Sequence, residues 1–174
     1  MIADTQLSVA ACYSPEIDNA RSYGGAMQSE GLETRSVRME RLLAVHLFAP
    51  TEDVDRIMEH VCRIVPLSQG AYDSNAFQSA SGIERYRPLE GAAAGAETEL
   101  RKRPGVVEVS FDMPDDQVLL EQVIETIYQV HSYQEPVIKV WDVLVSRSKG
   151  LDDKDNPYRW WNTTGDWKKK HSGA

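Results

Sequence analysis

The sequence predicts an α+β domain in which two helices cover one face of an antiparallel sheet. Residues 51–65 and 114–131 each repeat apolar side chains three and four positions apart, as amphipathic helices do. The other apolar segments are short or alternating runs, which are typical of strands. Their order along the chain is β-α-β-β-α-β with an extra hairpin arm, which is the ferredoxin-like split βαβ arrangement.

The first strand and the first helix are each ended by a proline. The run Leu42–Phe48 (LLAVHLF) predicts a central strand, which Pro50 ends. Thr51 is expected to cap the following helix, because acidic residues after it favour the positive end of the helix dipole. Pro66 ends this helix. The apolar stripe of the helix consists of Val54, Ile57, Met58, Val61, Cys62 and Val65.

The middle of the chain predicts three further strands. Residues 72–77 and 83–87 are expected to pair with each other as a hairpin, because Ser81-Gly82 between them favours a turn. Residues 88–104 are then expected to form a loop, and Val106–Phe111 to form the next strand.

A second helix and a long last strand complete the predicted domain. Pro114 and two aspartates start the helix. Its apolar stripe consists of Leu120, Val123, Ile124, Ile127 and His131. The strand 137–145 (VIKVWDVLV) is apolar on both faces, so the sheet face opposite the helices needs a cover. We therefore expect a homo-oligomer, in which a neighbouring subunit supplies that cover.

The two ends of the chain differ from the predicted domain at 41–146. Residues 1–40 read as a flexible arm, because glycines and serines interrupt every periodicity and large apolar residues are few. Residues 147–174 form a tryptophan-rich extension, with Tyr158, Trp160, Trp161 and Trp167 after a charged linker. These aromatics are expected to bury area on their own domain, on a neighbouring subunit or on a partner.

Composition narrows the classes of function. A net charge of −8 and a pI near 5.0 argue against nucleic-acid binding, which needs Lys and Arg to neutralise phosphates. No apolar run is long enough to span a membrane. Cys12 and Cys62 form neither a disulfide framework nor a zinc spacing. We therefore expect a cytoplasmic protein that binds neither nucleic acid nor membrane.

The segment His131–Pro136 (HSYQEP) has two interpretations. His131, Tyr133 and Glu135 alternate where the chain leaves the second helix, so His131 and Glu135 could act as an acid/base pair. Alternatively, His131 interacts with the carboxyl end of the helix while Pro136 starts the strand. A metal site would need further ligands, which the sequence does not place there.

Other polar residues are weaker candidates for a site. The run Arg101–Arg103 either contacts phosphates or is a solvated part of the loop. Gly91 and Gly95 lie in no phosphate-binding pattern. His46 alternates with apolar neighbours and is expected to be a strand histidine with a local partner.

Three short patches carry a family resemblance. The sequences His131-x-Tyr133-x-Glu135-Pro136, Tyr72-Asp73-Ser74 and Arg87-Pro-Leu-Glu-Gly91 resemble the YqfO/NIF3-associated domain, a relative in fold of the PII signalling proteins and the CutA1 proteins. The resemblance covers residues 41 to about 146. The glycine-rich turn that the family has before Tyr72 is reduced here, and the family's aromatic or asparagine after Gly91 is absent. We do not expect these 174 residues to contain the flanking domains that hold the dinuclear metal site of full NIF3 proteins, so the metal activity is not carried over.

The resemblance implies a non-catalytic module that senses a small anionic ligand, such as a nucleotide, in a cleft between the subunits of a trimer. The residues expected to line this cleft are Arg85, Arg87, Gly91, Arg101, Arg103, His131, Tyr133 and Glu135. Two alternatives remain open at this stage. One is a small tailoring or hydrolytic enzyme that uses His131 and Glu135, and the other is a CutA-like protein that binds a divalent metal.

Overall fold

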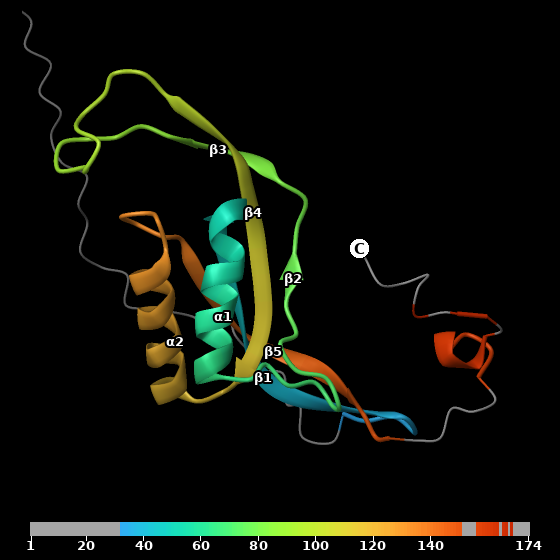
Figure 1. Ribbon diagram of the computed structural model, residues 1–174. Helices are drawn as coiled ribbons and strands as arrows, with labels where there is room; N and C mark the ends of the chain where they lie inside the picture. The colour runs from blue at the N-terminus through green and yellow to red at the C-terminus, as the bar shows by residue number, and fades with distance from the viewer. Residues whose placement is uncertain (1–31, 151–155, 164, 167, 169–174) are drawn as a thin grey trace, which may run out of the picture.

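In a computed structural model, two helices pack on one face of an antiparallel sheet (Figure 1). The structure describes residues 32–150, 156–163, 165–166 and 168. The strands are β1 (Val37–Pro50), β2 (Phe77–Gln78), β3 (Gly82–Tyr86), β4 (Arg101–Pro114) and β5 (Ile138–Ser148). The helices are η1 (Thr51–Asp53), α1 (Val54–Ile64), α2 (Gln117–Val130) and η2 (Trp160–Asn162).

The sheet order confirms the ferredoxin-like prediction. The strands follow one another as β2-β4-β1-β5, and β3 also pairs with β4. The central strand β1 is antiparallel to both neighbours, so that Val45 lies between Phe111 of β4 and Val140 of β5. This order is the split βαβ arrangement, because β4 lies between β1 and β2, the two strands that α1 connects.

Alternation along β1 divides the sheet into a covered face and an open face. Val45, Leu47 and Ala49 have no exposed surface and pack in the core with both helices. The helices contribute fully or almost fully buried residues to this core, namely Ile57, Val61, Val123 and Ile127. The intervening residues of β1 point to the open face, across which neither α-helix lies (Figure 1).

The helix boundaries agree with the sequence except at Thr51. This residue lies in η1, makes no capping bond, and donates its hydroxyl to the carbonyl of Gly105 at 2.9 Å. The predicted cap is therefore wrong, because the chain first makes a 3₁₀ turn that runs directly into α1. At the other end, Val65 is extended because Pro66 follows it. The helix α2 begins after Asp116, whose carboxylate accepts the amide of Leu119 at 3.0 Å.

The predicted hairpin is wrong in its pairing. Residues 72–77 and 83–87 do not pair with each other, since β2 and β3 both pair with β4. Strand β4 begins at Arg101, so Arg101–Arg103 lies in a strand and not in the predicted loop. The physical reason is Gly105, whose φ of +79° breaks the alternation that would have extended the predicted strand backwards. The turn of the long β3–β4 hairpin is therefore formed by residues 87–100.

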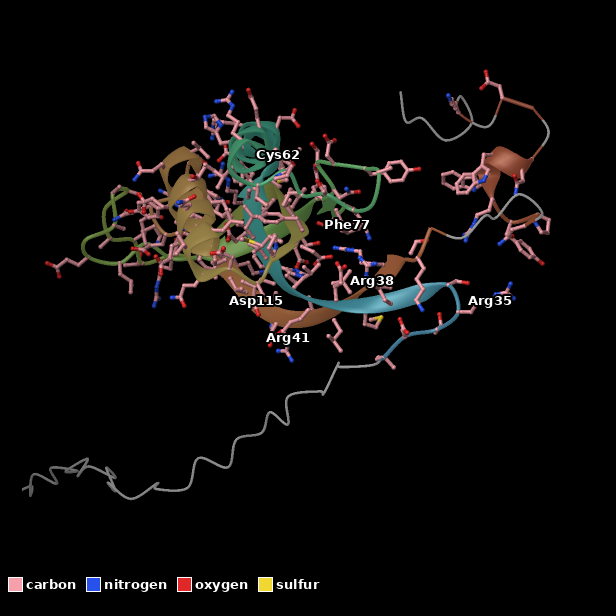
Figure 2. The ribbon with its side chains drawn as sticks, turned by 90° about the horizontal axis from the view of Figure 1, so that it is seen from below. Arg35, Arg38, Arg41, Cys62, Phe77 and Asp115 are labelled. Carbon is pink, nitrogen blue, oxygen red and sulfur yellow. The ribbon has the colours of Figure 1, made fainter. Side chains whose placement is uncertain are left out.

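Both ends of the described sheet extend beyond the predicted boundaries of 41 and 146. Strand β1 starts at Val37, which pairs with Ser148 at the end of β5. The outer halves of these two strands extend past the helices as a ribbon (Figure 2). Of the predicted arm, residues 1–31 lie outside the described part, as does Trp167 of the extension.

Candidate functional site

His131 joins the end of α2 to the central strand. Its backbone is extended at the helix C-terminus, and the residue is only 8% exposed. The ring Nε2 lies 3.0 Å from the Phe48 carbonyl of β1, and Nδ1 lies 3.0 Å from the amide of Tyr133. Because a carbonyl needs a donor and an amide needs an acceptor, these partners select the neutral Nε2–H tautomer. The ring thus contacts β1 and not the free carbonyls of its own helix, and both of its nitrogens are occupied.

Asp53 is a second buried polar group at this junction. It is 2% exposed, accepts the amide of Ser132 at 2.9 Å, and pairs with Arg56 at 2.5 Å. Arg56 in turn donates to the last helical carbonyl of α2, that of Val130, at 2.8 Å. Burial opposes ionisation of Asp53, but the bonds from Ser132 and Arg56 outweigh it and lower its pKa. In the sequence, Asp53 is only one of the acidic residues that follow Thr51, and its partner Ser132 could not be predicted because it is 79 residues away.

Tyr133 lies between the junction and the β3–β4 hairpin. Its ring contacts that of His131 at 4.8 Å, and the guanidinium of Arg103 lies over it at 5.0 Å from the centroid. The hydroxyl is buried beside Glu84 without a hydrogen bond in good geometry. Burial, and then the neighbouring Glu84 carboxylate, raise the pKa of Tyr133 above its usual value, so the phenol stays neutral.

Two of the predicted ligand-binding arginines already have acidic partners. Arg103 lies 3.3 Å from Glu52, and Arg101 Nε donates to Glu97 at 2.7 Å. The bond from Arg101 also lowers the pKa of Glu97. A ligand anion would have to compete with these carboxylates for either arginine.

The other cations of the hairpin have no such partner. Arg85 of β3 and Lys102 of β4 are directly opposite each other in the register, and both are exposed. Arg87 follows two residues after Arg85 and is also exposed. Within the part of the chain that the structure describes, none of the three forms an ion pair. We call Arg85, Arg87 and Lys102 the cationic hairpin face.

The remaining predicted residues lie around the loop at residues 87–100, which runs over the end of α2 (Figure 1). The side chain of Gln134 accepts the amide of Ala93 at 2.8 Å and donates to the carbonyl of Gly91 at 3.4 Å. These bonds anchor the loop to the α2–β5 junction. Glu135 is exposed and forms no hydrogen bond or ion pair with the described residues. The predicted set is therefore divided among the junction, the anchored loop and the cationic hairpin face.

The open sheet face carries two cavities that sequence reasoning missed. One of about 300 Å³ is bordered by His46, Asp112 and Arg147, and another of about 420 Å³ is bordered by Phe48 and Ile83. None of the eight predicted ligand-binding residues lines either cavity. The His46 ring lies 2.7 Å from Glu108 and meets Trp141 edge to face at 4.5 Å. The prediction that His46 has a local partner is thus confirmed.

The described residues form neither a metal cluster nor a membrane-spanning helix. Among them, no three His, Cys, Asp or Glu side chains come together in a way that could hold a metal ion. No helix in the described ranges is both long enough and apolar enough to cross a membrane.

Comparison with solved structures supports the fold. A NIF3-related protein from Bacillus cereus matches 60% of this chain and 26% of its own, with 21% identity and a TM-score of 0.50. The chain shares its fold with part of that protein. It spans about a quarter of that protein's length, so the activity of the whole protein is not transferred.

Two other structures show lower similarity. The divalent ion tolerance protein CutA1 of Ehrlichia chaffeensis is 16% identical, with 65% of this chain and 86% of that chain covered and a TM-score of 0.43. The GlnK protein of B. subtilis is 14% identical, with coverages of 60% and 86% and a TM-score of 0.38. No family model matches the sequence, and no curated protein does.

Proposed function

We propose that this chain is a non-catalytic sensing or interaction module of the cytoplasm that binds a small anion, such as a nucleotide, on its β3–β4 hairpin. The observation that carries the proposal is the pair Arg85 and Lys102, two exposed cations placed directly opposite each other. Like charges in this position destabilise a strand pair by roughly 0.2–1 kcal/mol. A bound phosphate or carboxylate would turn that repulsion into two attractions.

The location of the cationic hairpin face also suits a ligand site. The hairpin extends beyond the helices (Figure 1), while the Gln134 bonds hold its loop against the α2–β5 junction. Arg101 and Arg103 are paired with Glu97 and Glu52, which leaves Arg85, Arg87 and Lys102 as the available cations. The ligand-binding group that we propose is therefore smaller than the one expected from the sequence, and it includes Lys102.

We further propose that the site is completed by self-association, with a trimer as the expected form. Neither Arg85 nor Lys102 lines either of the two cavities described above, and both are exposed, so a neighbouring copy would supply a second wall around them. The open sheet face and the outer edge of β5, which pairs only with β1 among the described strands, provide surfaces for a neighbouring copy.

The geometry gives less support to the two alternative functions. An acid/base role for His131 would require its ring to leave the Phe48 carbonyl and the Tyr133 amide. A metal-binding role would require ligands from a second copy or from residues outside those described. Among the described residues, no contact favours the enzyme or the metal-binding alternative over the anion site.

Isothermal titration with ATP and with pyrophosphate tests the proposal. The wild type should bind at least one of them saturably, without releasing phosphate. A double variant, Arg85→Ala with Lys102→Ala, should weaken binding by about 10-fold or more, as expected when charge-assisted bonds are lost. The control Arg35→Ala removes an exposed cation that has no partner among the described residues and lies outside the hairpin. Equal weakening by control and double variant, or no binding at all, would contradict the proposal.

A further inference from the structure

The smaller cavity of the open sheet face has mostly polar walls. It lies where the loop that leads to Phe77 approaches the β1–β5 ribbon, and Arg147 of that ribbon borders it (Figure 2). The sheet contributes His46, Ser110 and Asp112, and the loop contributes Gln69 and Asn75. Its volume of about 300 Å³ is at the lower end of the range for ligand pockets, so the cavity suits a small polar molecule.

Asp112 supplies a free negative charge to this cavity. Its neighbours Phe111 and Met113 are buried in the core, so alternation along β4 directs Asp112 to the open face. The side chain is half-buried, and it forms no hydrogen bond or ion pair with any residue that the structure describes. An ionised carboxylate can only accept hydrogen bonds, and losing water without gaining a partner is costly. Asp112 is therefore ready to receive a cationic donor.

Arg147 supplies a positive charge to the same cavity. Its side chain is 13% exposed, and Nε donates to Glu40 at 3.1 Å. Nη1 donates to the carbonyl of Ser146 at 3.4 Å, while Nη2 has no partner within the described ranges. A guanidinium has donors on more than one edge, so the bond to Glu40 fixes its position and leaves Nη2 for a second acceptor.

The loop that forms the other wall is held in place by its own bonds. The amide of Ser74 donates to the carbonyl of Pro66 at 2.8 Å, and the side-chain amide of Asn75 donates to the carbonyl of Leu67 at 3.0 Å. Leu67 and Ser74 have positive φ angles of 51° and 53°, which side chains other than glycine rarely adopt. Such backbone conformations persist where the surroundings enforce them, and they cluster at ligand sites. The wall is thus formed before any ligand arrives.

The two charges of the cavity select a ligand that carries both signs. Asp112 and Arg147 border the same space but form no ion pair with each other. A simple cation would be attracted by Asp112 and repelled by Arg147, and a simple anion would meet the reverse. A molecule with an ammonium group and a carboxylate is complementary to both residues.

We propose that this cavity binds a free amino acid, with its ammonium group at Asp112 and its carboxylate at Nη2 of Arg147. The site is separate from the anion site of the proposed function, because no residue of the cationic hairpin face lines the cavity. The chain then has two ligand sites, one on the β3–β4 hairpin and one on the open sheet face.

Isothermal titration of the full chain with the standard L-amino acids, one at a time, tests the proposal. At least one amino acid should bind saturably. Its methyl ester lacks the carboxylate charge and its N-acetyl form lacks the ammonium charge, so each should bind about 10-fold or more weakly. If no standard amino acid binds saturably, or if either derivative binds as tightly as its parent, the proposal is wrong.

Variants of the two charged residues locate the site. Asp112→Asn and Arg147→Lys should each weaken amino-acid binding by about 10-fold or more. Arg147→Lys keeps a positive charge near Glu40 but loses the planar fork that binds carboxylates. Its matched control is Arg38→Lys, since Arg38 also pairs with Glu40 but does not line the cavity. The control for Asp112→Asn is Asp73→Asn, which changes an exposed carboxylate of the same loop outside the cavity.

The pattern among these variants decides between the two sites. Both controls, and Arg85→Ala with Lys102→Ala, should bind the amino acid as the wild type does. If a control weakens binding as much as its cavity variant, or if neither cavity variant weakens it, the assignment to this cavity is overturned. If only the hairpin variant weakens binding, the amino acid binds at the anion site, and this inference fails while the proposed function stands.

Discussion

Replacing Asp53 by alanine should destabilise the protein through the junction between α1 and α2. The carboxylate accepts a buried bond from the Ser132 amide, and such a bond to a charged group contributes roughly 1.5–3 kcal/mol. The pair with Arg56 adds less, about 0.3–0.5 kcal/mol, because the Arg56 side chain is 45% exposed. We therefore expect Asp53→Ala to lower the free energy of unfolding by about 2–3.5 kcal/mol.

Urea unfolding, followed by circular dichroism at a fixed chain concentration, measures this loss. The control is Asp55→Ala, which removes an exposed acidic residue from the same helical turn and loses only the dipole interaction, about 0.3–1 kcal/mol. If the two variants unfold within about 0.5 kcal/mol of each other, Asp53 does not hold the junction, and the reasoning fails.

Three further predictions concern the same elements. The pKa of Asp53 is lower folded than unfolded, so its contribution is complete above about pH 4 and disappears as the pH falls through the folded value. The stability difference between the wild type and Asp53→Ala should shrink in acid; a constant difference down to pH 2 would contradict this. His131→Ala should cost about 1–3 kcal/mol in urea unfolding, since two part-buried backbone groups lose partners, yet leave ATP affinity unchanged. An unchanged stability with a lost activity would instead favour the enzyme alternative. Lys102→Glu should raise stability by roughly 0.2–1 kcal/mol through attraction to Arg85 while weakening anion binding, and a stability loss would refute the cross-strand repulsion.

The helices and the central strand could be predicted because their apolar periods are regular. The stripe from Val54 to Val65 and the run Leu42–Phe48 each have one physical interpretation. Strand β4 was predicted only from Val106 onwards, because Pro104 and Gly105 interrupt its alternation. Because residues 101–105 were missed, residues 83–87 were paired with the wrong strand.

The candidate site was predicted in composition but not in arrangement. Once Arg101–Arg103 is known to be a strand, alternation places Lys102 on the opposite face from its two neighbours. The bond between Asp53 and Ser132 and the contact between Arg103 and Tyr133 could not be predicted, because they join residues distant in sequence.

The central claim is that anions bind to the cationic hairpin face and not to the paired arginines. NMR titration of the arginine Nε–H signals with pyrophosphate tests it most directly. We predict that the signals of Arg85 and Arg87 shift saturably while those of Arg101 and Arg103 stay in place, because Glu97 and Glu52 already hold the latter two. Saturable shifts of Arg101 and Arg103 with an unmoved Arg85 would contradict the account.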